Sequence, residues 1–119
     1  MANILIIDDS RTSRRILTNI LKEHGDTVIG EAVNGADGVA KFKELKPDIV
    51  TLDITMPVMD GLEALKTIRE LDDNAKIIMI TAAGQQEKMV EAVKHGASEF
   101  ITKPFEAAEV IKAIESLQA

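Results

Sequence analysis

Five polar residues of this 119-residue chain follow apolar runs, and together they could carry out one kind of chemistry. They are three carboxylates, a hydroxyl and an ammonium: Asp8, Asp9, Asp53, Thr81 and Lys103. If the fold gathers them, the carboxylates can bind a divalent metal, and the hydroxyl and ammonium can contact a phosphoryl group. An aspartate in such a site can attack phosphorus and form an aspartyl phosphate.

The elements that must position these residues are five strands and five helices in alternation. Short apolar runs bounded by turn-forming residues predict the strands Asn3–Ile7, Thr27–Ala32, Ile49–Asp53, Lys76–Thr81 and Glu99–Thr102. A βα unit repeated five times predicts a doubly wound parallel sheet, with helices on both faces and right-handed crossovers. We therefore expect an α/β fold that forms a single domain over residues 1–119.

Apolar residues at helical spacing predict the five helices. The predicted inner faces are Ile16, Leu17, Ile20 and Leu21; Val39, Phe42 and Leu45; Leu62, Leu65 and Ile68; Met89, Val90 and Val93; and Val110, Ile111, Ile114 and Leu117. Ser10 is a favourable N-cap for the first helix, which Gly25 ends. Asn34 with Gly35 indicates a turn, and Pro47 ends the second helix.

The second strand is the most polar one and carries no functional side chain after Ala32 and Val33, which suits the edge of a sheet. With this strand at the edge, the strand order is 2-1-3-4-5, the flavodoxin-like order. The carboxyl ends of the other four strands are then neighbours. Ligands of open α/β sheets bind outside such ends, so the polar residues are expected to meet there.

Three carboxylates that meet at one edge repel one another and need cations. Lys103 supplies one positive charge, and a divalent metal supplies the two that remain. Because the chain has no cysteine, oxygen ligands and a hard metal are expected, and Mg²⁺ suits them best. In this hypothesis Asp53 attacks phosphorus, Asp8 and Asp9 hold the metal, and Lys103 and Thr81 meet the phosphoryl oxygens.

Composition and charge exclude other classes of protein. The formal net charge of −6 argues against nucleic acid as the main partner. No apolar run is long enough to span a membrane, so a cytoplasmic protein is expected.

His24 and His95 lie near predicted helix ends, where imidazoles are ordinary, and no chemistry is assigned to them.

Each candidate residue also has a purely structural interpretation. Asp9 with Ser10 can simply start a helix, and Asp53 can cap a turn. Thr81 can be an ordinary residue at the end of a strand, and a lone lysine such as Lys103 is usually solvated. The joint placement of these residues after four strands favours the functional interpretation.

The chain also resembles a known family, the receiver domains of bacterial two-component response regulators. The resemblance covers essentially the whole chain and rests on Asp8-Asp9, Asp53 with Met56-Pro57 and Asp60-Gly61, Thr81-Ala82, and Lys103-Pro104-Phe105. Its length is that of the stand-alone chemotaxis regulators of this family. The resemblance implies a phosphorylation-activated switch, in which Asp53 accepts a phosphoryl group from a sensor histidine kinase.

The resemblance also implies a metal site and a set of contacts to the phosphoryl group. Asp8, Asp9 and Asp53, with the backbone carbonyl of Thr55, would bind Mg²⁺, for which Mn²⁺ could substitute. Thr81 would contact the phosphoryl group together with Lys103.

A conformational switch is implied as well. The Lys103–Pro104 peptide bond would be cis, and Phe100 would swing inward when Thr81 moves. Many relatives have a tyrosine at the position of Phe100. Because phenylalanine has no hydroxyl, a switch based on packing is expected here. The output surface would lie around the fourth helix, the fifth strand and the last helix, near Lys94, Phe100 and Ala107.

The expected partners follow from the family. They are a CheA-like sensor histidine kinase, the flagellar motor switch protein or another downstream protein, and a phosphatase. No nucleic acid or membrane is expected, and the protein is expected to be a monomer. It is expected to be a signalling phosphoacceptor rather than an enzyme, although it promotes its own phosphorylation and autodephosphorylation.

Three alternatives stay open. A phosphatase of the haloacid-dehalogenase type uses an aspartyl nucleophile, but it needs a second acid two residues later, where this chain has Thr55. A flavin-binding electron carrier shares the strand order, but the chain lacks Trp, Tyr and a phosphate-binding loop after the first strand. Within the family, a phosphorelay intermediate or a receiver of another pathway is the third.

Overall fold

Five parallel strands form one sheet in the order β2-β1-β3-β4-β5, as expected from the sequence. The structure is a computed structural model and describes residues 1–118. The strands are β1 (Asn3–Ile7), β2 (Thr27–Ala32), β3 (Ile49–Asp53), β4 (Lys76–Thr81) and β5 (Glu99–Thr102). The helices are α1 (Arg11–His24), α2 (Gly35–Leu45), α3 (Gly61–Leu71), α4 (Gln86–Lys94) and α5 (Ala107–Gln118). The expected flavodoxin-like α/β fold is confirmed.

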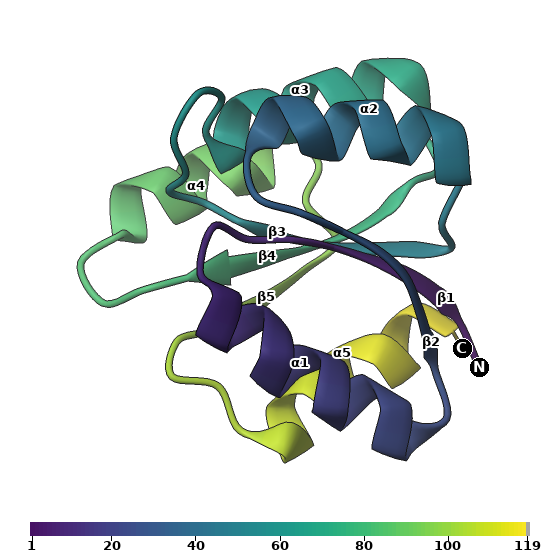
Figure 1. Ribbon diagram of the computed structural model, residues 1–119. Helices are drawn as coiled ribbons and strands as arrows, with labels where there is room; N and C mark the ends of the chain where they lie inside the picture. The colour runs from purple at the N-terminus through teal and green to yellow at the C-terminus, as the bar shows by residue number, and fades with distance from the viewer. Residues whose placement is uncertain (119) are drawn as a thin grey trace.

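Helices cover the sheet on both faces (Figure 1). One face is covered by α1 and α5, and the other by α2, α3 and α4. Alternate residues of the inner strands therefore enter two separate cores: Leu5 and Ile7 pack toward α2 and α3, whereas Ile4 and Ile6 pack toward α1 and α5. Burial on both faces explains why β1, β3 and β4 are nearly continuous apolar runs. Each fully buried large apolar side chain contributes about 1.5–3 kcal/mol.

Side-chain caps fix where α1, α2 and α3 begin. The Ser10 hydroxyl accepts a hydrogen bond from the Ser13 amide (3.2 Å), and α1 therefore starts three residues after Asp8. The prediction of a turn at Asn34 and Gly35 is wrong, because these residues start a helix: Asn34 is the N-cap of α2 and Gly35 is its first residue. A methyl group on Gly35 would overlap the carbonyl oxygen of Met59, so α2 can begin there only with glycine.

Two of the predicted helix faces are partly wrong. Val90 and Val93 of α4 are 55% and 58% exposed, and the buried residue of this helix is Ala92. Ile16 of α1 is 47% exposed, whereas Leu17 is buried. In α1 the buried row, Leu17 and Leu21, is narrower than the predicted stripe, and in α4 a different residue faces the sheet. The buried stripes of α2, α3 and α5 include Phe42, Leu65, Ile68, Val110 and Ile114, as predicted.

Among residues 1–118, no helix has the length and apolar character that would be needed to cross a bilayer.

His24 joins the end of α1 to two other parts of the fold. Its Nδ1 lies 2.8 Å from Asp26 Oδ2, and its Nε2 lies 3.3 Å from Glu115 Oε2 on α5. The buried Asp26 carboxylate also accepts a hydrogen bond from the Ala2 amide (2.9 Å). Hydrogen bonds to the Asp26 and Glu115 carboxylates raise the pKa of His24.

We expect His24 to make stability depend on pH. Since the pKa is raised in the folded state, its contribution is fully present below the unfolded pKa of about 6.5 and is lost as pH rises through the folded pKa. The difference in unfolding free energy between wild type and His24→Gln, measured by urea denaturation, should therefore shrink from pH 6 to pH 9. A difference that stays constant across this range would contradict the assignment.

Candidate functional site

The carboxyl ends of four neighbouring strands form the candidate site. Asp8 directly follows β1, Asp53 is the last residue of β3, and Thr81 is the last residue of β4. Lys103 directly follows β5. The strands end nearly level with one another, because β3 and β4 pair Asp53 with Ile80 and the last pair of β4 and β5 joins Thr81 to Thr102. The sheet therefore places the sequence-predicted residues at one edge.

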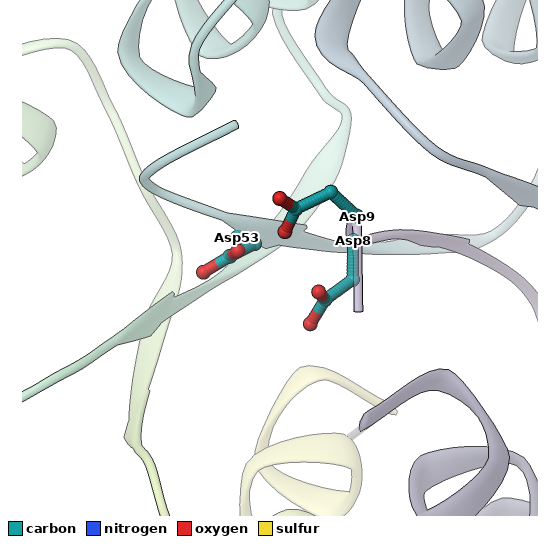
Figure 2. Close-up of side chains that lie close together, drawn as sticks. All are labelled: Asp8, Asp9 and Asp53. Carbon is teal, nitrogen blue, oxygen red and sulfur yellow. The ribbon is translucent and has the colours of Figure 1, made fainter. Parts of the chain in front are cut away.

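Three carboxylates lie together at this edge. Oxygen atoms of Asp8, Asp9 and Asp53 all lie within 4.8 Å of one another. Figure 2 shows the side chains of Asp8 and Asp9 leaving the end of β1 toward different sides, with Asp53 beside them at the end of β3. Asp8 is 1% and Asp53 7% exposed, whereas Asp9 is exposed. The cluster thus consists of two buried carboxylates, Asp8 and Asp53, and one carboxylate in contact with solvent, Asp9.

Lys103 supplies the positive charge nearest to the cluster. Its Nζ lies 3.0 Å from Asp8 Oδ2 and 3.7 Å from Asp53 Oδ2. The contact with Asp8 is an ion pair without the geometry of a hydrogen bond. The backbone of Lys103 is held at the end of β4, because its amide donates to the Thr81 carbonyl (2.6 Å). The peptide bond from Lys103 to Pro104 is cis.

The electrostatics of the cluster are set by burial and by like charge. Burial raises the pKa of Asp53 to about 6, the carboxylates of Asp8 and Asp9 contribute to the rise, and the Lys103 ammonium opposes it. With all three acids ionised, one ammonium leaves two negative charges uncompensated, which one divalent cation would balance. Carboxylate oxygens are also the ligands that Mg²⁺ prefers, so the residues present fit this ion.

The loop between β3 and α3 folds tightly against the end of β3. The Gly61 amide donates to the Ile54 carbonyl (2.7 Å), and a methyl group on Gly61 would overlap the carbonyl oxygen of Asp53. Val58 in this loop has a φ of 70°, an uncommon and strained conformation for a β-branched residue. The sequence pattern identified Asp60 and Gly61 as turn-forming residues, but it did not reveal that Gly61 sets the position of Asp53.

The remaining sequence-predicted residues lie around the cluster. Thr81 is buried, and Thr55 is exposed with its hydroxyl accepting a hydrogen bond from Gln85 Nε2 (2.6 Å). Phe100 lies two residues before the end of β5, paired with Met79, and packs half-buried against the core under α2, α3 and α4. The structure thus brings Asp8, Asp9 and Asp53 into one group with Lys103, and it places Phe100 farther down the sheet.

Arg14 is a residue near the site that the sequence reasoning missed. Its Nη1 donates to the Asp8 carbonyl (2.7 Å), and its Nε pairs with Glu31 Oε1 (3.0 Å) on β2. The amide of Ser10 donates to Asp8 Oδ1 (2.8 Å) and fixes the carboxylate itself. Arg11, Arg14 and Arg15 all lie in α1, and only the folded structure shows which of these arginines reaches back to Asp8.

Comparisons with known proteins agree with one another. The family described as "Response regulator receiver domain" matches residues 4–115. The chemotaxis protein CheY of Thermotoga maritima is 50% identical, over 96% of this chain and 95% of that protein. CheY of Listeria monocytogenes is 52% identical, over 97% of each. The crystal structure of the CheX–CheY–BeF3–Mg²⁺ complex from Borrelia burgdorferi contains a chain with a TM-score of 0.93 and 41% identity, over 98% of this chain and 89% of that one.

Close packing at Gly61 leads to a first prediction for the site. Gly61→Ala should lower the free energy of unfolding by about 2–3 kcal/mol, because the new methyl group would displace the Asp53 backbone. Gly84→Ala is the matched control: Gly84 has a φ of 86° but open space around it, so only backbone strain of about 1 kcal/mol is expected. Urea denaturation measures both, and equal costs would contradict the packing argument.

A second prediction concerns the charge of Asp53. In metal-free protein, the Asp53 carboxyl should titrate at a pH of about 6, and Lys103→Met should raise its pKa further by removing the opposing ammonium. Carboxyl ¹³C resonances followed against pH measure both values. An unchanged or lower pKa in Lys103→Met would show that the lysine does not act on this carboxylate.

Proposed function

The chain belongs to the response regulator receiver domain family, and we propose that it is a phosphorylation-activated signalling switch in bacterial chemotaxis. The observation that carries the proposal is the group of three carboxylates with Lys103 at the end of β3. Asp53 is the proposed phosphoacceptor, since it ends the central strand and lies close to both the other two acids and the Lys103 ammonium. In this proposal residues 1–119 form one receiver domain.

The acidic group is proposed to hold Mg²⁺, or Mn²⁺, through Asp8, Asp9, Asp53 and the backbone carbonyl of Thr55. When bound, the ion supplies charge neutralisation for the phosphoryl oxygens. Asp8 is prepared for this role, because Arg14 and the Ser10 amide fix its backbone and its carboxylate. Asp9 is exposed and can reach the ion from the solvent side.

In the proposed reaction, an Asp53 carboxylate oxygen attacks the phosphorus atom of a phosphohistidine on a sensor kinase. The new oxygen–phosphorus bond forms as the nitrogen–phosphorus bond breaks, and the electron pair leaves with the imidazole of the kinase. Lys103 can then bind a phosphoryl oxygen, since its Nζ already lies 3.7 Å from Asp53 Oδ2. The Thr81 hydroxyl is proposed to contact a second phosphoryl oxygen from the end of β4.

Activation is proposed to pass from Thr81 to Phe100 through the core. A phosphoryl group adds charge and acceptor oxygens that draw in the Thr81 hydroxyl. Phe100 packs half-buried against the core beside α4, and it has no hydroxyl to hydrogen-bond. Its response to a shift of β4 is therefore a change of packing, which can alter the surface formed by α4, β5 and α5.

The proposed partners are those of a chemotaxis regulator. They are a CheA-like sensor histidine kinase, the flagellar motor switch protein and a phosphatase. The relatives named CheY support the pathway, and the Borrelia burgdorferi complex contains CheX bound to CheY. The exposed Val90 and Val93 on α4, with Lys94 beside them, supply apolar contact area for a protein partner on the proposed output surface.

Incubation with acetyl phosphate and Mg²⁺, followed by intact-mass spectrometry, tests the phosphoacceptor. Wild type should gain one phosphoryl group only when Mg²⁺ is present, and Asp53→Asn should gain none. Asp73→Asn, an exposed carboxylate in the turn after α3, is the matched control and should behave as wild type.

Two outcomes would contradict the proposal. The first is a gain that persists in Asp53→Asn, which would place the acceptor elsewhere. The second is a wild type that gains no phosphoryl group from either acetyl phosphate or a phosphohistidine donor. Steady hydrolysis of a phosphate ester over many turnovers would instead favour a phosphatase.

A further inference from the structure

The residue that precedes α4, Gln85, uses its side chain in an unusual way. It occupies the N-cap position, but its side chain makes no capping hydrogen bond to the helix. The N-cap side chains of α1, α2 and α3, by contrast, all accept a hydrogen bond from their own helices; they are Ser10, Asn34 and Asp60. The amide group of Gln85 is therefore free for other contacts.

That amide group joins two loops. Gln85 Oε1 accepts a hydrogen bond from the Ala82 amide (2.6 Å), and Gln85 Nε2 donates to Thr55 Oγ1 (2.6 Å). The acceptor and donor roles agree with the chemistry of the partners, since a backbone N–H can only donate. We call this pair of hydrogen bonds the Gln85 latch.

Both loops leave strands that end in the candidate site. Ala82 directly follows Thr81, and Thr55 comes two residues after Asp53. The two strands are joined up to the Ile54 amide, which donates to the Ile80 carbonyl (3.1 Å). Beyond that point the chains diverge into their loops, and the Gln85 latch ties the loops together again.

The turn that carries the latch has few other contacts around Gly84. The backbone amide of Gln85 closes the turn of residues 82–85, because it donates a long hydrogen bond to the Ala82 carbonyl (3.3 Å). Gly84 within this turn has a φ of 86° and no atom within 4 Å of the place where a Cβ would stand. Little packing therefore holds the turn in place, and the side chain of Gln85 supplies the contacts that packing does not.

We propose that Gln85 is a positioning residue for phosphoryl transfer: its latch holds the Thr55 and Thr81 backbones in a fixed relation to Asp53. The inference rests on the proposed function, which gives the Thr55 carbonyl to the metal and the Thr81 hydroxyl to the phosphoryl group. Without the latch, each loop moves independently, and ion binding must first order the Thr55 loop. Mg²⁺ affinity is therefore lowered although no ligand is lost.

Gln85→Met tests the latch without shortening the side chain, and it removes no helix cap because none exists. Thr55→Val removes only the hydroxyl acceptor and keeps the backbone carbonyl. Gln86→Met is the matched control, since Gln86 is the exposed neighbour and has no hydrogen bond of its side chain among residues 1–118. Because the chain has no Trp or Tyr, calorimetry and amide NMR are the suitable measurements.

Gln85→Met and Thr55→Val should each raise the Mg²⁺ dissociation constant about two- to tenfold, the range that one neutral hydrogen bond supports. The double variant should lose no more than either single one, because both changes break the same link. The Ala82 amide proton should exchange faster in Gln85→Met. Without metal, the Gln85→Met protein should have the same thermal midpoint of unfolding as the Gln86→Met protein. Equal midpoints would separate an effect on positioning from a loss of stability.

Two results would overturn the proposal. One is a Gln85→Met protein that matches Gln86→Met in both Mg²⁺ affinity and Ala82 exchange. The other is additive losses in the double variant, which would mean that Gln85 and Thr55 act separately. Failure of the proposed function is distinct, since wild type would then gain no phosphoryl group, whereas failure of the latch leaves that gain intact.

Discussion

The mutual repulsion of three carboxylates is the constraint on which the rest of the structure depends. Asp8 and Asp53 are buried beside each other, with Asp9 at the rim, and burial with like charge raises the pKa of Asp53 to about 6. A fold can sustain such a group only if it also supplies compensation. Here the compensation comes from Lys103, held at the end of β5, and from the chemistry of cation and phosphoryl binding that the excess negative charge favours.

Rigid surroundings make this arrangement useful. Gly61 lets α3 start against the carbonyl of Asp53, and Arg14 holds the carbonyl of Asp8 from the other side. Packing is sparser in the turn around Gly84 and in α4, which buries a single residue, Ala92. A rigid site beside a weakly packed helix is the combination that a switch needs, because a local change of charge can then move a surface at low cost in free energy.

Sequence alone was sufficient for the strands, for their order and for the meeting of the three carboxylates with Lys103. Each of these follows from one strong local signal: an apolar run that ends in a polar side chain, such as Asp53 or Thr81. The failures all involve tertiary geometry. Val90 and Val93 were assigned to a buried face because apolar spacing cannot tell how narrow a helix contact is. The long-range hydrogen bonds of Arg14 and Gln85 have no periodic signal at all.

The two-sided burial of β1 has a further consequence for how the chain finds its alignment. In a strand with one wet face, a slip of one residue would expose apolar side chains, and this penalty defines the pairing. Ile4, Leu5, Ile6 and Ile7 are all fully buried, so a slipped β1 would present equally apolar side chains to both layers. The charged residue at the end of the strand breaks this degeneracy, because a slip that puts Asp8 in the place of Ile7 would drive its carboxylate between the layers. Asp8, whose negative charge adds to the repulsion in the site, thus also defines where β1 ends in the sheet.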